Sequence, residues 1–137
     1  MRLTASPVWR EDVPNDPDGG FILGKVLDLD TVSSIEAKCS KTGVGDSNEV
    51  TVELYGHKRV NMTAKNCLTG WGNLFDEQGK ELKFNTKGLR EAIKFVVTVK
   101  EDDKPSRRIR FLEWVDEVHS RKYEEYQEGL TEATKNS

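Results

Sequence analysis

The sequence has few of the residues and patterns that mark the commoner functional classes. Of its 137 residues, only two are cysteine and two are histidine. Two cysteines are too few for a disulfide scaffold or a cysteine-rich zinc site, and they favour a reducing compartment. No stretch approaches the ~20 apolar residues of a membrane-spanning helix. Residues 1–10 also lack the apolar core of a secretory signal, so we expect a cytoplasmic protein.

Patterns of metal binding and catalysis are missing as well. His57 and His119 lie far apart, and neither belongs to a paired-ligand motif such as His-Glu-x-x-His. A zinc site would require Cys39, Cys67 and both histidines to converge from four separate elements. The acidic runs lack the glycine and glutamate spacing of a calcium loop. We therefore expect no catalytic residues, no metal and no cofactor, which predicts a protein that is not an enzyme.

Charge, by contrast, is abundant. One third of the residues are charged, only 35% are hydrophobic and the mean hydropathy is −0.68, which indicates a lean core in a chain of single-domain length. Residues 56–100 hold nine basic and four acidic side chains, whereas both flanking segments are net acidic. A basic middle fits a nucleic-acid-binding face, self-association or a solvated surface. The overall net charge of −3 argues against nucleic acid as the partner.

Residues 1–20 are predicted to form an irregular N-terminal arm. Pro7, Pro14 and Pro17 alternate there with aspartate, asparagine and glycine, which is typical of turns and forbids a helix. Trp9 lies within this arm. Its indole ring could anchor the arm to the core, or it could remain exposed as a contact for a partner.

Hydrophobic periodicity predicts an α+β domain over residues 21–127. Strands are expected at residues 21–27, 49–55, 71–75 and 81–84, and helices at about 31–39, 86–97 and 106–126. Asp28 or Asp30 is expected to cap the first helix. Residues 60–68 fit either a strand or a helix, with a slight preference for the helix. The result would be a small antiparallel sheet packed by about three helices, followed by a flexible polar tail over residues 128–137.

Residues 70–85 carry the sharpest local pattern. The run from Asp76 to Lys80 predicts a turn in which Gly79 takes the left-handed conformation. Asn85 is expected to cap the next helix. Gly70 and Trp71 precede the turn, and we expect the ring of Trp71 to be buried. These residues are thus assigned a structural role.

The same segment resembles small tail-assembly proteins of tailed bacteriophages and prophages. The shared pattern is Gly-Trp, a short apolar stretch, Asp-Glu-x-Gly and then Phe-Asn at the start of a helix. It corresponds here to Gly70-Trp71, Asp76 to Gly79 and Phe84-Asn85, with similar flanks at residues 16–21 and 130–136. The valine-rich segment 95–99 departs from the pattern.

This resemblance implies a non-enzymatic chaperone that binds tape-measure or tail-tube proteins during virion morphogenesis. Such a chaperone must cover apolar surface that would otherwise aggregate. Two other functions remain open: a structural virion component, such as a head–tail connector or minor tail protein, and a small nucleic-acid-binding or regulatory module.

The last predicted helix is unusually rich in aromatic residues. Phe111 and Trp114 fall outside the stripe drawn by Ile109, Leu112 and Val115, so the apolar surface is wider than one helix seam requires. We therefore expect this surface to contact a tail protein or a second copy of the chain. The predicted partner contacts are Trp9, Phe111, Trp114, Tyr123 and Tyr126.

Overall fold

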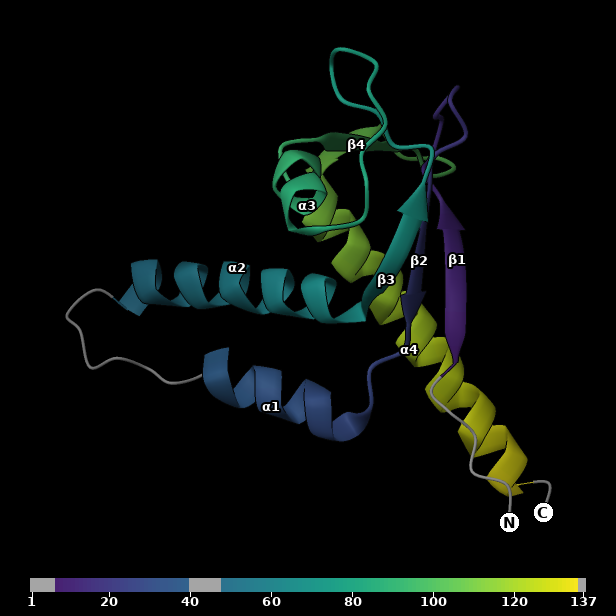
Figure 1. Ribbon diagram of the computed structural model, residues 1–137. Coiled ribbons are helices and arrows are strands. Elements are labelled where there is room, and N and C mark those ends of the chain that lie inside the picture. Colours follow the sequence, from purple (N-terminus) through teal and green to yellow (C-terminus); the bar gives the residue numbers. More distant parts are fainter. Residues whose placement is uncertain (1–6, 40–47, 136–137) are drawn as a thin grey trace.

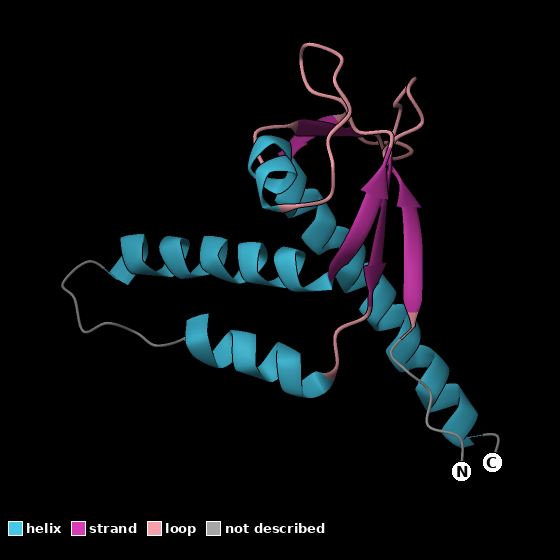
Figure 2. Cartoon of the chain, in the orientation of Figure 1, coloured by secondary structure: helices cyan, strands magenta, loops and turns pink. Residues whose placement is uncertain are grey.

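The computed structural model describes residues 7–39 and 48–135, and it has an α+β architecture (Figures 1 and 2). The elements in chain order are β1 (Val8–Asp12), β2 (Phe21–Lys25), α1 (Leu29–Cys39), α2 (Asn48–Cys67), β3 (Leu68–Gly72), α3 (Thr86–Ala92), β4 (Val96–Val99), β5 (Arg107–Arg110) and α4 (Phe111–Lys135). Within the described ranges these form four helices and two antiparallel sheets, which confirms the predicted fold class. No helix in these ranges is long and apolar enough to cross a membrane.

The larger sheet has the strand order β1-β2-β3. Trp9 on β1 is opposite Gly24 on β2, and a register shift follows Leu23 in the pairing with β3. A Cβ atom on Gly24 would lie 2.3 Å from the Trp9 ring, so only glycine allows the indole to lie against the strand.

The segment predicted as an irregular arm therefore contains a strand, which corrects the prediction for residues 8–12. Pro7 precedes β1, while Pro14 and Pro17 lie in the turn after it, so the prolines bound the strand without interrupting it. Trp9 is only 9% exposed and belongs to the core. Its interpretation as an anchor is confirmed, and its assignment as a partner contact is wrong.

The predicted strand at residues 49–55 is also wrong, because these residues form the first half of α2. The helix continues through residues 60–67, where Ala64 and Cys67 are fully buried, and it ends where Leu68 begins β3. A short alternating pattern does not distinguish strand from helix when a longer helical pattern continues it. The preference for a helix over most of residues 60–68 is confirmed.

Only the first part of the helix predicted over residues 86–97 is helical in the structure, and its last residues belong to a strand. Asn85 caps α3 as expected, since its side-chain oxygen accepts a hydrogen bond of 2.7 Å from the Gly88 amide. The helix ends at Ala92, and the β-branched residues that follow form β4. Val97 pairs with Ile109 of β5, so the last helix begins at Phe111 and not near residue 106.

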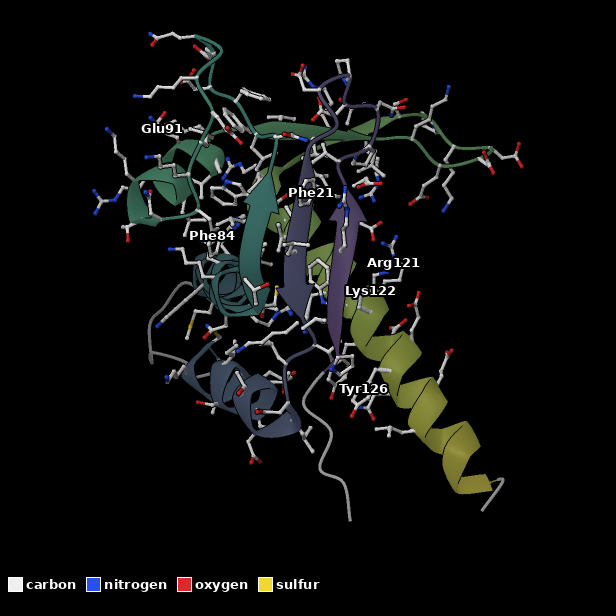
Figure 3. All side chains as sticks on the ribbon, turned by 45° about the vertical axis from the view of Figure 1, so that its right-hand side comes forward. Phe21, Phe84, Glu91, Arg121, Lys122 and Tyr126 are labelled. Atoms are coloured by element: carbon white, nitrogen blue, oxygen red, sulfur yellow. The ribbon has the colours of Figure 1, made fainter. Side chains whose placement is uncertain are left out.

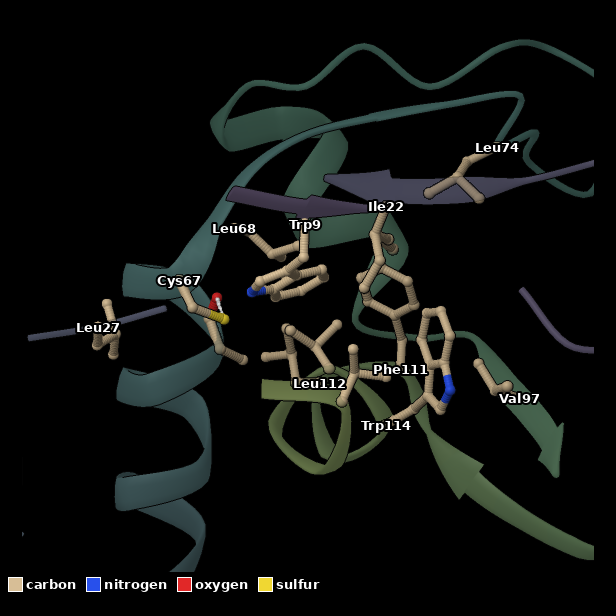
Figure 4. Close-up of a cluster of buried hydrophobic side chains, with 14 of the residues drawn as sticks. Trp9, Ile22, Leu27, Cys67, Leu68, Leu74, Val97, Phe111, Leu112 and Trp114 are labelled. Atoms are coloured by element: carbon tan, nitrogen blue, oxygen red, sulfur yellow. Dashed lines mark hydrogen bonds between the residues drawn. The ribbon is translucent and has the colours of Figure 1, made fainter. Parts of the chain in front are cut away.

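Helix α4 runs to Lys135, through most of the segment predicted as a flexible tail. Figure 1 shows it passing behind the three-stranded sheet and continuing beyond the strand ends. Its first turns are fully or almost fully buried: Phe111 is 2% exposed, Trp114 4% and Val115 0%. Figure 4 shows Phe111 beside Ile22 of β2 and Trp114 beside Val97 of β4. Each such burial stabilises the fold by about 1.5–3 kcal/mol.

Candidate protein-binding cleft

A cleft of about 640 Å³ lies where three segments meet at one end of the molecule. Its walls are the turn between β1 and β2, the segment after β3, and β4, all at the upper end of Figure 1. We call it the head cleft and define it by residues 13–18, 73–75, 95–98, Lys100 and Phe111.

The first wall is the segment after β3, residues 73–75, which the Asp76–Lys80 turn holds in place. One Asp76 carboxylate oxygen accepts hydrogen bonds from the amides of Gln78 and Lys80, at 2.9 and 2.8 Å. Gly79 has a φ of 81°, which confirms the predicted left-handed residue. The two arms of the turn pair through a bridge between Phe75 and Glu81. The turn thereby fixes Phe75, which is 36% exposed at the cleft.

Trp71 joins this wall to the core. Its indole N–H donates a hydrogen bond of 2.9 Å to the Leu82 carbonyl. Its ring stands edge-on to Phe84 and Phe111, with centroid distances of 4.9 and 6.1 Å. Gly70 lies in β3, opposite Leu23. The structural role predicted for the Gly-Trp pair thus corresponds to a packed aromatic cluster beside the cleft.

The second wall is the turn between β1 and β2, which Asp16 stabilises. The Asp16 carboxylate accepts hydrogen bonds from the amides of Asp18 and Gly20, at 3.0 and 2.9 Å. The side-chain amide of Asn73 donates to the Gly19 carbonyl at 3.4 Å and so links the first two walls. Residues 16–18 and 73–75, which belong to two segments of the pattern described in the sequence analysis, therefore lie together at this cleft.

The third wall is β4, which sequence reasoning placed in a helix. Val97 is 5% exposed and points into the core, whereas Val96 is 49% exposed and Thr98 is also exposed. The cleft thus combines exposed apolar groups, Phe75 and Val96, with a strand at its margin. The run of β-branched residues from Val96 to Val99 was the signal that could have located this strand.

The aromatic residues predicted as partner contacts do not gather at one surface. Trp9, Phe111 and Trp114 are buried, so the exposure that the prediction required is absent, and all three are corrected to core residues. Phe111 reaches the cleft only as part of its floor. Tyr123 and Tyr126 are half-buried on α4, outside the cleft, and their role in partner binding stays a prediction.

The ionisable groups of the core are positioned for packing. Burial raises the pKa of the Cys67 thiol to about 12, so this cysteine is a protonated, unreactive side chain at neutral pH. His119 accepts a hydrogen bond of 3.0 Å at Nε2 from the Leu27 amide, and burial lowers its pKa. Burial also raises the pKa of Asp116. In the part of the chain that the structure describes, no three histidine, cysteine or acidic side chains are grouped to hold a metal.

No protein-family model, curated protein or solved structure gives a significant match to this chain. The likeness to tail-assembly proteins therefore rests on the residues of the motif and its flanks. In the structure, residues 16–18 and 73–75 of these segments line adjacent walls of the head cleft, while the motif residues Gly70, Trp71, Gly79 and Asn85 lie outside its lining.

Proposed function

We propose that this protein is a non-enzymatic tail-assembly chaperone of a tailed bacteriophage or prophage. It acts in the cytoplasm of the host bacterium, where it binds tape-measure or tail-tube proteins before the tail polymerises. The observation that carries the proposal is the head cleft, where residues 16–18 and 73–75, parts of two of these segments, lie beside exposed apolar side chains.

The chemistry of the cleft suits this task. Subunits that have not yet polymerised expose apolar surface and unpaired strand edges, which aggregate unless another protein covers them. The head cleft offers Phe75 to apolar groups and the strand β4 to extended backbone. Binding of this kind needs shape and apolar contact and requires no reactive side chain.

The direct test is co-purification with the tape-measure and tail-tube proteins encoded in the same phage or prophage genome. We expect a complex in size-exclusion chromatography and fewer aggregates of the tail protein when the two are co-expressed. Phe75→Ser should weaken the complex about tenfold or more, as truncation of an interface aromatic commonly does. Leu29→Ser is the matched control, because Leu29 is 66% exposed but lies on α1, outside the cleft.

Equal binding by the two variants, once both are shown to fold, would contradict the cleft as the binding site. Failure of the wild-type protein to bind either tail protein would contradict the chaperone function. Stoichiometric amounts of the chain in purified particles would instead favour the structural virion component.

A further inference from the structure

Strand β4 has one open edge. Within the described residues it pairs only with β5, and the Phe111 amide donates to the Phe95 carbonyl at 3.0 Å. Because hydrogen-bonded and non-hydrogen-bonded pairs alternate in antiparallel strands, Val97 also bonds to β5, while the backbone groups of Val96 and Thr98 point away. No hydrogen bond from another described residue reaches these outward groups. Residues 96–98 line the head cleft and no residue of β5 does, so the open edge faces the cleft.

The four residues of β4 themselves lack the protection that natural edge strands usually carry, and the first charge after them is Lys100 at the margin of the cleft. Charged side chains, prolines, bulges or a covering helix normally prevent such strands from pairing with other chains. On β1, Glu11 forms ion pairs with Arg121 and Lys122 of α4 at 2.6 and 3.5 Å, and Figure 3 shows the helix beside that strand. Strand β4 contains three valines and one threonine, with no charge and no proline.

The outer face of the hairpin is basic. Val96 pairs in register with Arg110 and Thr98 pairs with Arg108, so these four exposed side chains share one face. Neither Arg108 nor Arg110 forms an ion pair with another described residue, whereas Arg107 binds Glu117 through two hydrogen bonds of 3.0 and 2.9 Å. The opposite face of β4 presents Val97 to the core.

From these features we propose that the partner binds by adding an extended strand to the open edge of β4. Successive side chains of an added strand point to opposite faces. One set would enter the head cleft and must be apolar. The other set would lie about 10 Å from β5, two strand spacings away, where acidic side chains can meet Arg108 and Arg110. The occupant is therefore an extended segment in which apolar and acidic residues alternate; that it belongs to a tail protein rests on the proposed function.

The first test uses a short blocked peptide in which valine alternates with glutamate, titrated into isotope-labelled protein and followed by amide NMR shifts. We expect the amides of Val96 and Thr98 to move most. A peptide with lysine in place of glutamate should bind about tenfold more weakly, because its charge repels the arginines. An acidic peptide that is N-methylated along one edge should not bind, since it cannot form the strand hydrogen bonds.

The second test uses proline at two register partners. The amides of Thr98 and Arg108 both point out of the hairpin, but from opposite edges, so proline at either removes no hydrogen bond within it. Thr98→Pro should abolish binding of the acidic peptide. The Arg108→Gln variant reports the loss of the charge alone. The Arg108→Pro protein should bind the acidic peptide no more weakly than this control does. Should Thr98→Pro fail to fold, the N-methylated peptide decides the question on the wild-type protein.

Several outcomes would overturn strand addition. They are equal affinity for the acidic and lysine peptides, retained binding of the N-methylated peptide, or shifts that avoid Val96 and Thr98. A tail protein that still binds folded Thr98→Pro would also overturn it, while the chaperone function would stand. Peptide binding at β4 without capture of any tail protein would overturn the function alone.

Discussion

Two apolar regions of this molecule, the start of α4 and strand β4, have opposite surroundings. Trp114 on α4 is 4% exposed and packs in the core, whereas Val96 on β4 is 49% exposed beside the head cleft. Sequence reasoning placed Trp114 at a partner surface and Val96 and Val97 at the end of a helix. A large aromatic residue gains the most from burial, so the fold buries it first.

The difference follows from where each segment lies in the fold. Helix α4 crosses the three-stranded sheet, and its first turns are enclosed by β2, β4 and α2 (Figure 4). Among the residues that the structure describes, strand β4 has a neighbouring strand on one side only, so one edge and one face stay accessible. Apolar character is thus evidence for a binding site only where the fold leaves it uncovered.

The largest expected effect is that of Trp114→Ala. Removing this buried indole leaves a cavity and should lower the free energy of unfolding by about 3–5 kcal/mol. Urea denaturation measures the loss, and Tyr126→Ala on the half-buried part of α4 is the control with a smaller effect. A Trp114→Ala protein that keeps wild-type stability but no longer binds its partner would contradict the assignment of Trp114 to the core. It would show instead that Trp114 is a partner contact.

The next effect concerns the turn that holds the cleft wall. Gly79 has a φ of 81° and open space around it, so Gly79→Val introduces backbone strain without a clash. We expect a loss of about 1–3 kcal/mol. Gly79→Asn should lose clearly less, because asparagine tolerates the left-handed region. Thermal melts would show equal losses if the strain argument were incorrect.

The pH dependence tests the core side of the comparison. The pKa of His119 is lowered from 6.5 by burial, so its contribution to stability is full above pH 6.5 and is lost as the pH falls through the pKa of the folded state. The raised pKa of Asp116 acts in the opposite sense, since it favours the folded state at low pH. We expect the urea concentration at the unfolding midpoint to decrease as the pH is lowered below 6.5, and to decrease less steeply in the His119→Gln protein.

The smallest effect on stability is expected at β4 itself. Val96→Ser should change the free energy of unfolding by no more than about 0.5 kcal/mol, as for most exposed positions. Val97→Ser, one residue along the same strand, removes a buried side chain and should cost about 1.5–3 kcal/mol. Equal losses in chemical denaturation would mean that the two faces of β4 are not distinct.

The sequence by itself determined the features that neighbouring residues build. The Asp76–Lys80 turn, the Asn85 cap and the cap of α1 each depend on hydrogen bonds between residues at most four positions apart. Of the two residues expected to cap α1, Asp28 accepts the hydrogen bond from the Thr31 amide, and Asp30 lies inside the helix. Residue preferences act at this range, so these features were predicted together with β2 and the α+β class. One wall of the head cleft, the segment before the Asp76 turn, was within reach of the same reasoning.

Only the tertiary structure decided that residues 8–12 and 96–99 form the strands β1 and β4, and that the head cleft lies where it does. A strand is completed by hydrogen bonds to a partner strand elsewhere in the sequence, as in the pairing of Trp9 with Gly24 and of Val97 with Ile109. The local pattern of residues 8–12 therefore left their state open until β2 was in place, and the β-branched run at residues 96–99 favoured a strand whose partner, β5, only the fold supplied. Burial was decided in the same way, because the exposure of Val96 and the enclosure of Trp114 depend on which elements lie above them.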